Sequence, residues 1–110
     1  MNTLFAINLG GDGEIPGVLN QQGPWALNPN WESVDGRPLA ALVADGHAFL
    51  ICPNTQLPLP DESCGVVSTN NVPVGIVAYH GPGVQVSEIH RILKSGGQWI
   101  HDGLPVWIKP

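Results

Sequence analysis

The sequence predicts an α/β protein with a mainly parallel sheet and a few short helices. Three runs of strand length, Leu4–Leu9, Ala48–Cys52 and Gly65–Thr69, are rich in apolar or β-branched residues. Near-continuous apolar runs are typical of strands buried on both faces, as in a parallel sheet. Segments with a helical spacing of apolar residues alternate with strands along the chain, which favours the same architecture. The 14 glycines and 11 prolines among 110 residues indicate short elements joined by fixed turns.

A single compact domain, residues 1–110, is expected from length and composition. A chain of 110 residues with 43% hydrophobic content is long enough to form one small core. No apolar run approaches the roughly 20 residues that span a bilayer. Met1–Thr3 has no basic residue ahead of the first apolar run, so we expect no signal peptide. The expected location is the cytoplasm, or a cytoplasm into which a larger protein delivers this domain.

The charge of the chain argues against general binding to nucleic acid. The formal net charge is −5, and lysine and arginine together number only four. A protein that binds phosphate backbones needs several cations on one face. The charge does not argue against a small nucleotide-like ligand held by backbone amides. No membrane partner is expected.

The first half of the chain begins with a buried strand and a glycine-rich loop. Leu4–Leu9 runs directly into Gly10–Glu14, where three glycines allow positive φ angles and a close approach of the backbone to a ligand. In an open α/β sheet, ligands bind at the carboxyl ends of the strands, where this loop would lie. Pro16 and Gly17 follow, so any helix after the loop is absent or one turn long. A short second strand is expected at Val18–Asn20.

A loop and a short helix are expected next. Gln21–Trp31 contains glycine, two prolines and two asparagines, which is typical of a loop. Its tryptophans, Trp25 and Trp31, are expected to pack as lids over the core rather than to stack on a ligand. Pro38 favours the start of a helix, and the apolar spacing after it predicts a helix over Leu39–Ala44.

Turn residues divide the second half of the chain. Two alternating prolines in Leu57–Ser63 exclude a helix or a central strand. Gly65–Thr69 is expected to be a strand, and Asn70 and Asn71 at its carboxyl end would lie on the ligand side of the sheet. Val72–Gly83 is expected to be irregular.

Ser87–Asp102 predicts a helix, a turn and a strand in succession. Apolar residues fall at i, i+3 and i+4 from Ile89, which marks one face of a helix. Gly96–Gly97 is expected to stop this helix, because glycine accepts the left-handed conformation that ends one. Gln98–His101 would then resume as a strand. Val106–Ile108, flanked by prolines, is expected to be a final strand at a sheet edge.

Three segments resemble class I methyltransferases that use S-adenosylmethionine. Leu57–Val67, which reads L-P-L-P-D-E-S-C-G-V-V, resembles their L-P-F-P-D-x-S-F-D-V-V segment. Ser87–Gly97, which reads S-E-I-H-R-I-L-K-S-G-G, is similar to their E-x-x-R-V-L-K-P-G-G. Ile7–Gly13, which reads I-N-L-G-G-D-G, is similar to the L-N-L-G-C-G opening of a compact branch of that family.

The resemblance implies a small Rossmann-like fold, S-adenosylmethionine as cofactor, and methyl transfer to an unknown acceptor. Gln22 stands where the family pattern has an acidic residue for the ribose hydroxyls, and Pro53 stands where a second acidic residue contacts the adenine. An amide forms weaker hydrogen bonds than a carboxylate. The resemblance implies cofactor binding by Asn8, Gly10, Gly11, Asp12, Gly13, Gln22, Asn54 and Thr55, and it places Asn70 and Asn71 beside the transferring methyl group.

Two other interpretations stay open, because a fold does not fix a function. The domain could be the C-terminal effector, or toxin, domain of a larger secreted bacterial protein with another chemistry. It could also be a non-catalytic module that binds a protein partner, since four tryptophans would suit an interface. The polar candidates for another chemistry are His80, His90, His101, Asp12, Glu14 and Asp102.

No metal site is predicted, because the histidines and cysteines show no paired ligand spacing. Cys52 and Cys64 alone make no disulfide framework and are expected to be small buried residues. No serine lies on a G-x-S-x-G turn, which argues against a serine nucleophile of that kind.

Overall fold

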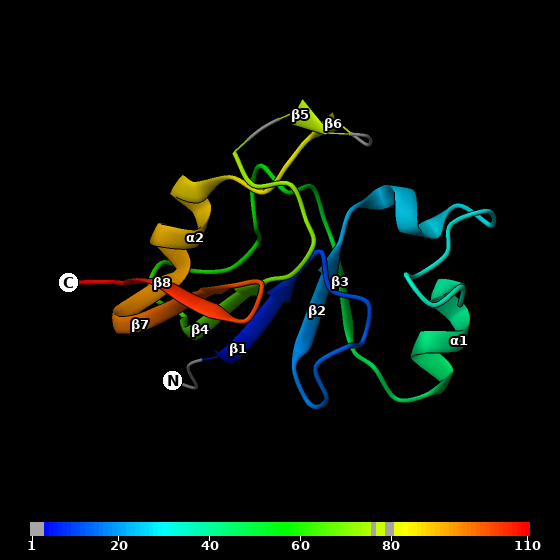
Figure 1. Cartoon of the computed structure of the whole chain (residues 1–110), viewed down its shortest axis with the longest axis horizontal. Helices are drawn as coiled ribbons and strands as arrows, with labels where there is room; N and C mark the ends of the chain where they lie inside the picture. The colour runs from blue at the N-terminus through cyan, green and yellow to red at the C-terminus, as the bar shows by residue number, and fades with distance from the viewer. Residues whose placement is uncertain (1–3, 76, 79–80) are drawn as a thin grey trace.

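The computed structural model describes residues 4–75, 77–78 and 81–110, and its main feature is a six-stranded sheet (Figure 1). The strand order is β3-β2-β1-β4-β7-β8. Five strands run parallel, and β8 pairs antiparallel with β7 at one edge. The strands are β1 (Leu4–Leu9), β2 (Leu19–Gln22), β3 (Phe49–Ile51), β4 (Cys64–Thr69), β7 (Leu93–His101) and β8 (Leu104–Ile108).

Short helices and a small hairpin complete the described chain. Helix α2 lies beside β7, and helix α1 lies toward the other end of the sheet, near β3 (Figure 1). The expected α/β class, with a mostly parallel sheet and few helices, is confirmed. None of the helices in the described residues is long and apolar enough to cross a membrane. The remaining elements are the 3-10 helix η1 (Pro24–Leu27), α1 (Leu39–Ala44), α2 (Val86–Ile92), and strands β5 (Val77–Ala78) and β6 (Gly81–Pro82), which pair antiparallel.

One face of the sheet carries the main core. The strand register aligns one apolar residue from each of five strands in a row across this face: Leu19, Ile7, Val67, Trp99 and Trp107. Ile89 and Ile92 of α2 are fully buried in the same cluster, which explains the apolar spacing of this helix. Burial of each such side chain contributes about 1.5–3 kcal/mol.

The expected end of the second helix at Gly96–Gly97 is wrong. Helix α2 ends at Ile92, and Leu93 is already extended, with φ −72° and ψ 136°. Leu93 instead begins β7, where it is fully buried and pairs with Cys64 of β4. The ammonium of Lys109 donates to the carbonyl oxygens of His90 and Leu93 at 2.8 and 2.7 Å, in place of a further helical turn.

Gly96 and Gly97 lie at an irregularity in the pairing of β7 with β4. Pairing with β4 shifts register between Cys64 and Val66, which faces Gln98. Gly96 has a φ of +80°, and a Cβ on Gly97 would lie 2.8 Å from the carbonyl oxygen of Lys94. Such a bulge needs residues without side chains.

The second strand is longer and more polar than expected. It covers Leu19–Gln22 rather than Val18–Asn20, because Gln21 and Gln22 pair with Leu50 and Ile51 of β3. The expected strand Ala48–Cys52 is observed as Phe49–Ile51. The expected strand Val106–Ile108 is observed at the sheet edge as Leu104–Ile108. The segment expected to be irregular contains the short β5–β6 hairpin.

Candidate functional site

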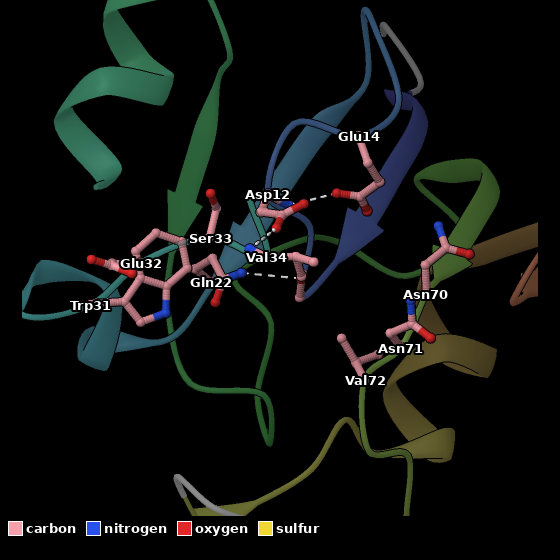
Figure 2. Close-up of a pocket in the computed structure, with 11 residues that line it drawn as sticks. Asp12, Glu14, Gln22, Trp31, Glu32, Ser33, Val34, Asn70, Asn71 and Val72 are labelled. Atoms are coloured by element: carbon pink, nitrogen blue, oxygen red, sulfur yellow. Dashed lines mark hydrogen bonds between the residues drawn. The ribbon is translucent and has the colours of Figure 1, made fainter. Parts of the chain in front are cut away.

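A pocket of about 430 Å³ lies at the carboxyl ends of β1, β2 and β4 (Figure 2). From β1 the chain passes to β2 and β3 on one side, whereas β4 and β7 lie on the other side. In open α/β sheets, ligands bind where the strand order reverses in this way. The lining residues are Gly10, Asp12, Glu14, Gln22, Trp31, Glu32, Ser33, Val34, Asn70, Asn71 and Val72.

Four backbone N–H groups of the glycine-rich loop, those of residues 10–13, are used inside the protein. Gly10 donates to the side-chain oxygen of Gln21 at 3.0 Å, and Gly13 donates to that of Asn20 at 3.2 Å. Gly11 donates to the carbonyl oxygen of Asn8 at 3.2 Å, and Asp12 donates to Glu14 Oε2 at 2.8 Å. A ligand held by these amides would have to displace an existing acceptor. The loop is therefore a preformed wall of the pocket.

Gln22 bridges this wall to the following loop. Its Nε2 donates to the carbonyl oxygens of Gly10 and Gly11 at 3.0 and 2.9 Å. Its Oε1 accepts a hydrogen bond from Trp25 Nε1 at 3.2 Å. Both amide hydrogens are thus engaged, although Gln22 borders the pocket. The side-chain N–H groups of Gln22 thus bind the protein backbone, and only its side-chain oxygen can accept a further hydrogen bond from a ligand.

Asp12 and Glu14 form a hydrogen-bonded carboxyl pair at the pocket. Burial and the hydrogen bond with Glu14 raise the pKa of Asp12. Burial alone would raise the pKa of Glu14, but hydrogen bonds from the Asp12 carboxyl and backbone N–H and from Asn8 lower it to about 2. Asp12 Oδ2 also accepts the N–H of Val34 at 2.9 Å (Figure 2). Glu14 consequently holds a negative charge, and Asp12 ties two walls of the pocket together.

The pocket suits a cationic ligand better than an anionic one. Asp12, Glu14 and Glu32 supply carboxyl groups, and no lysine or arginine is among the residues that line the pocket. Trp31 adds an indole ring, which attracts cations over its face. Trp31 and Glu32 lie on one side of the pocket and Asn70 and Asn71 on the other (Figure 2). A phosphate group would meet only repulsion from the carboxylates.

The structure brings together five of the ten predicted site residues. Gly10, Asp12, Gln22, Asn70 and Asn71 line this pocket. The other five lie outside its lining. Asn8 is fully buried below the loop, Asn54 accepts a hydrogen bond from Gln21, and the remaining three are Gly11, Gly13 and Thr55.

Sequence reasoning missed the wall formed by residues 31–34. The sequence predicts Trp31 as a lid over the core, and no sequence pattern predicts a site at Glu32, Ser33 and Val34, yet all four residues line the pocket. The one available signal was their position in the loop that follows β2. Because the Asp12–Val34 hydrogen bond joins residues 22 positions apart, no local pattern could have placed this wall.

Three of the remaining polar candidates, His90, His101 and Asp102, are not among the residues that line the pocket. His90 stacks on Trp107 with ring centres 3.8 Å apart, His101 contacts Thr69, and His80 lies outside the described residues. Cys52 and Cys64 are free and buried, and burial raises the pKa of both thiols. In the described part of the chain, no three metal-ligating side chains gather into a group.

Comparison with known proteins gives no relative. No protein-family model matches the chain, and no curated protein matches its sequence. The functional argument therefore rests on the geometry of the site.

Proposed function

We propose that the pocket binds S-adenosylmethionine and that the protein transfers its methyl group to an acceptor. The observation that carries the proposal is a pocket lined by carboxyl groups, without lysine or arginine, at the point where the strand order reverses. Its volume of about 430 Å³ lies within the range of small-molecule sites. The sequence resemblance to class I methyltransferases supports the same assignment.

The sheet order supports a Rossmann-like fold. Numbered within the sheet alone, the strands follow the order 3-2-1-4-5-6. This is the order of doubly wound sheets that bind nucleotides at the reversal point. The last strand departs from the pattern because β8 runs antiparallel.

The charge of the pocket favours a sulfonium cofactor over a dinucleotide. S-adenosylmethionine carries a positive sulfonium and an ammonium group, which complement Asp12, Glu14 and Glu32. A dinucleotide needs the N-terminus of a helix for its pyrophosphate. Here the loop Gly10–Glu14 leads to β2, and no helix lies between β1 and β2.

The proposed contacts come from side chains more than from glycine amides. Asp12 and Glu32 would face the cationic groups, Trp31 would lie against the sulfonium or the adenine, and Asn70 and Asn71 would border the acceptor. Methyl transfer depends mainly on alignment of nucleophile and sulfonium. The proposal therefore requires no acid–base residue at the reacting atoms.

Calorimetric titration tests the proposal with two ligands that differ in charge. We expect S-adenosylmethionine to bind more tightly than S-adenosylhomocysteine, which lacks the sulfonium charge. Glu32→Gln, which removes a carboxylate from the pocket lining, should reduce this preference about threefold to tenfold, as loss of a charged partner would. Glu62→Gln, which changes an exposed carboxylate outside the pocket lining, is the matched control. Absence of heat with both ligands at millimolar concentration would overturn the proposal, as would tighter binding of NADH.

A further inference from the structure

A chain of hydrogen bonds and one histidine–carboxylate contact connects the core to the edge of the pocket at the carboxyl ends of β4 and β7. Trp99 Nε1 donates to Thr69 Oγ1 at 2.9 Å, and Thr69 Oγ1 lies 2.7 Å from His101 Nδ1. His101 Nε2 lies 3.4 Å from Asp102 Oδ2. Asp102 Oδ1 accepts the backbone N–H of Asn71 at 2.7 Å. Only the last residue lines the pocket.

The first hydrogen bond of this chain has a fixed direction. The indole N–H of Trp99 can only donate, so Thr69 Oγ1 accepts from it. Thr69 is fully buried, and its hydroxyl shares a hydrogen bond with His101 Nδ1, in which either atom can donate. The other ring nitrogen, Nε2, faces the carboxylate of Asp102. The buried side of the chain thereby orients the Asp102 side chain.

Asn71 needs such support because its backbone is strained. Its φ is +53°, and that of Asp102 is +49°, a region that costs non-glycine residues energy unless neighbours hold them. Two hydrogen bonds of opposite direction tie the turns together. Asp102 N donates to the carbonyl oxygen of Thr69 at 2.9 Å, and Asn71 N donates to the Asp102 carboxylate.

We propose that Asp102 is a positioning residue of the pocket, which holds Asn71 in its left-handed conformation while Thr69 and His101 hold Asp102. This inference rests on the proposed function, because it concerns the binding of the cofactor in the same pocket. Asp102 touches no ligand directly and acts through Asn71. The carboxylate matters as an acceptor rather than as a charge near the ligand.

Two substitutions at Asp102 separate these roles. Asp102→Gly removes the carboxylate without backbone strain, because glycine accepts a positive φ. We expect it to weaken binding of S-adenosylhomocysteine about tenfold, as loss of a charge-assisted hydrogen bond would. Asp102→Asn keeps an acceptor oxygen and tolerates the same φ, so we expect it to restore binding to within about twofold of wild type. Leu104→Ala, a change of an exposed residue in the same hairpin, is the control.

The amide resonance of Asn71 provides a readout independent of the ligand. In Asp102→Gly we expect its proton signal to move upfield and its hydrogen exchange to accelerate, and in Asp102→Asn we expect both to stay near wild type. If wild type binds the probe and Asp102→Gly binds equally well, the inference is overturned while the proposed function stands. If wild type does not bind, the proposed function fails, and the Asn71 signals still decide whether Asp102 holds the turn. Equal weakening by both variants with an unchanged Asn71 signal would also overturn the inference.

Discussion

At the scale of single residues, Gly11 shows how tightly the pocket wall is built. A Cβ at this position would lie 2.5 Å from Asn20 Oδ1 and 2.6 Å from Asn8 Nδ2. Both carboxamides are fully buried and hydrogen-bonded, so neither can move without loss of a bond. Gly11 is not among the residues with a positive φ. Glycine is therefore required here because a side chain would clash, and not because of the backbone conformation.

We expect Gly11→Ala to lower the free energy of unfolding by about 1–3 kcal/mol, as overpacking of a well-packed site does. Urea unfolding measures the change. Ser95→Ala, an exposed position in β7, should stay within about 0.5 kcal/mol of wild type. A Gly11→Ala protein as stable as this control would show that the loop is not packed as described.

At the scale of elements, Arg91 joins α2 to the proline-rich segment before β4. Its guanidinium donates to the carboxylates of Glu88 and Asp61 and to the carbonyl oxygens of Leu57 and Leu59, at 2.7–3.0 Å. Glu88 in turn accepts the N–H of Leu57 at 2.7 Å. The L-P-L-P-D and E-x-x-R motifs are thus two halves of one contact. Neither segment lies in the sheet, and each supplies hydrogen-bond partners for polar groups of the other.

Arg91→Met should lower the free energy of unfolding by about 2 kcal/mol, because it removes the guanidinium to which Glu88 and two carbonyl groups are hydrogen-bonded. The exposed pairs of Arg37 with Asp35 and Asp45 provide a control, since salt bridges between exposed side chains contribute little and Arg37→Met should lower the stability less than Arg91→Met does. Urea unfolding at neutral pH compares the two variants. Equal losses would contradict the role given to the Arg91 contact.

The same comparison has an expected pH dependence. Hydrogen bonds from Arg91 lower the pKa of Glu88 below its ordinary value of 4.5. A lowered carboxyl pKa contributes stability above pH 4.5 that is lost as the pH falls through the folded-state pKa. The stability difference between wild type and Arg91→Met should therefore narrow below pH 4.5.

The elements differ in how far local sequence determines them. Leu4–Leu9 could be predicted because its apolar run is continuous, and Leu39–Ala44 because Pro38 starts it and the apolar spacing repeats. The end of β2 was missed because Gln21 and Gln22 are polar side chains buried by partners distant in sequence. The start of β7 was missed because Leu93 continues the helical spacing, and only pairing with β4 makes it a strand. For the site, the strand ends were predictable, whereas the wall at residues 31–34 depends on a tertiary contact.

At the scale of the whole molecule, the strand order determines how well the backbone amides of each strand are protected from hydrogen exchange. β1 and β4 are central, each paired on both sides, whereas β3 and β8 are edges. β3 has only three residues. β8 contains Pro105 and lies opposite a register shift, and both features disfavour pairing with another chain. Opening of the sheet should therefore begin at its edges.

Native-state hydrogen exchange followed by NMR tests this gradient. We expect the slowest exchange at the amides of Ile7, Leu9 and Val67, which are buried in the two central strands. The amides of β3 and β8 should exchange by lower-energy local opening. Protection in β8 equal to that in β1 would mean that something covers this edge in solution.

The amide side chains of Asn8, Asn20, Gln21 and Gln22 have a further consequence for how this protein can evolve. All four are buried and bonded to the backbone or to side chains of the loops around the pocket. Their replacement by apolar residues would leave several buried partners unsatisfied. Glu32, Asn70 and Asn71 border the same pocket, and their side chains are not part of this buried amide network. Substitutions at the second group of residues can therefore change which ligand binds, while the first group is retained because folding depends on it. Ligand specificity and folding thus depend on different side chains of one site.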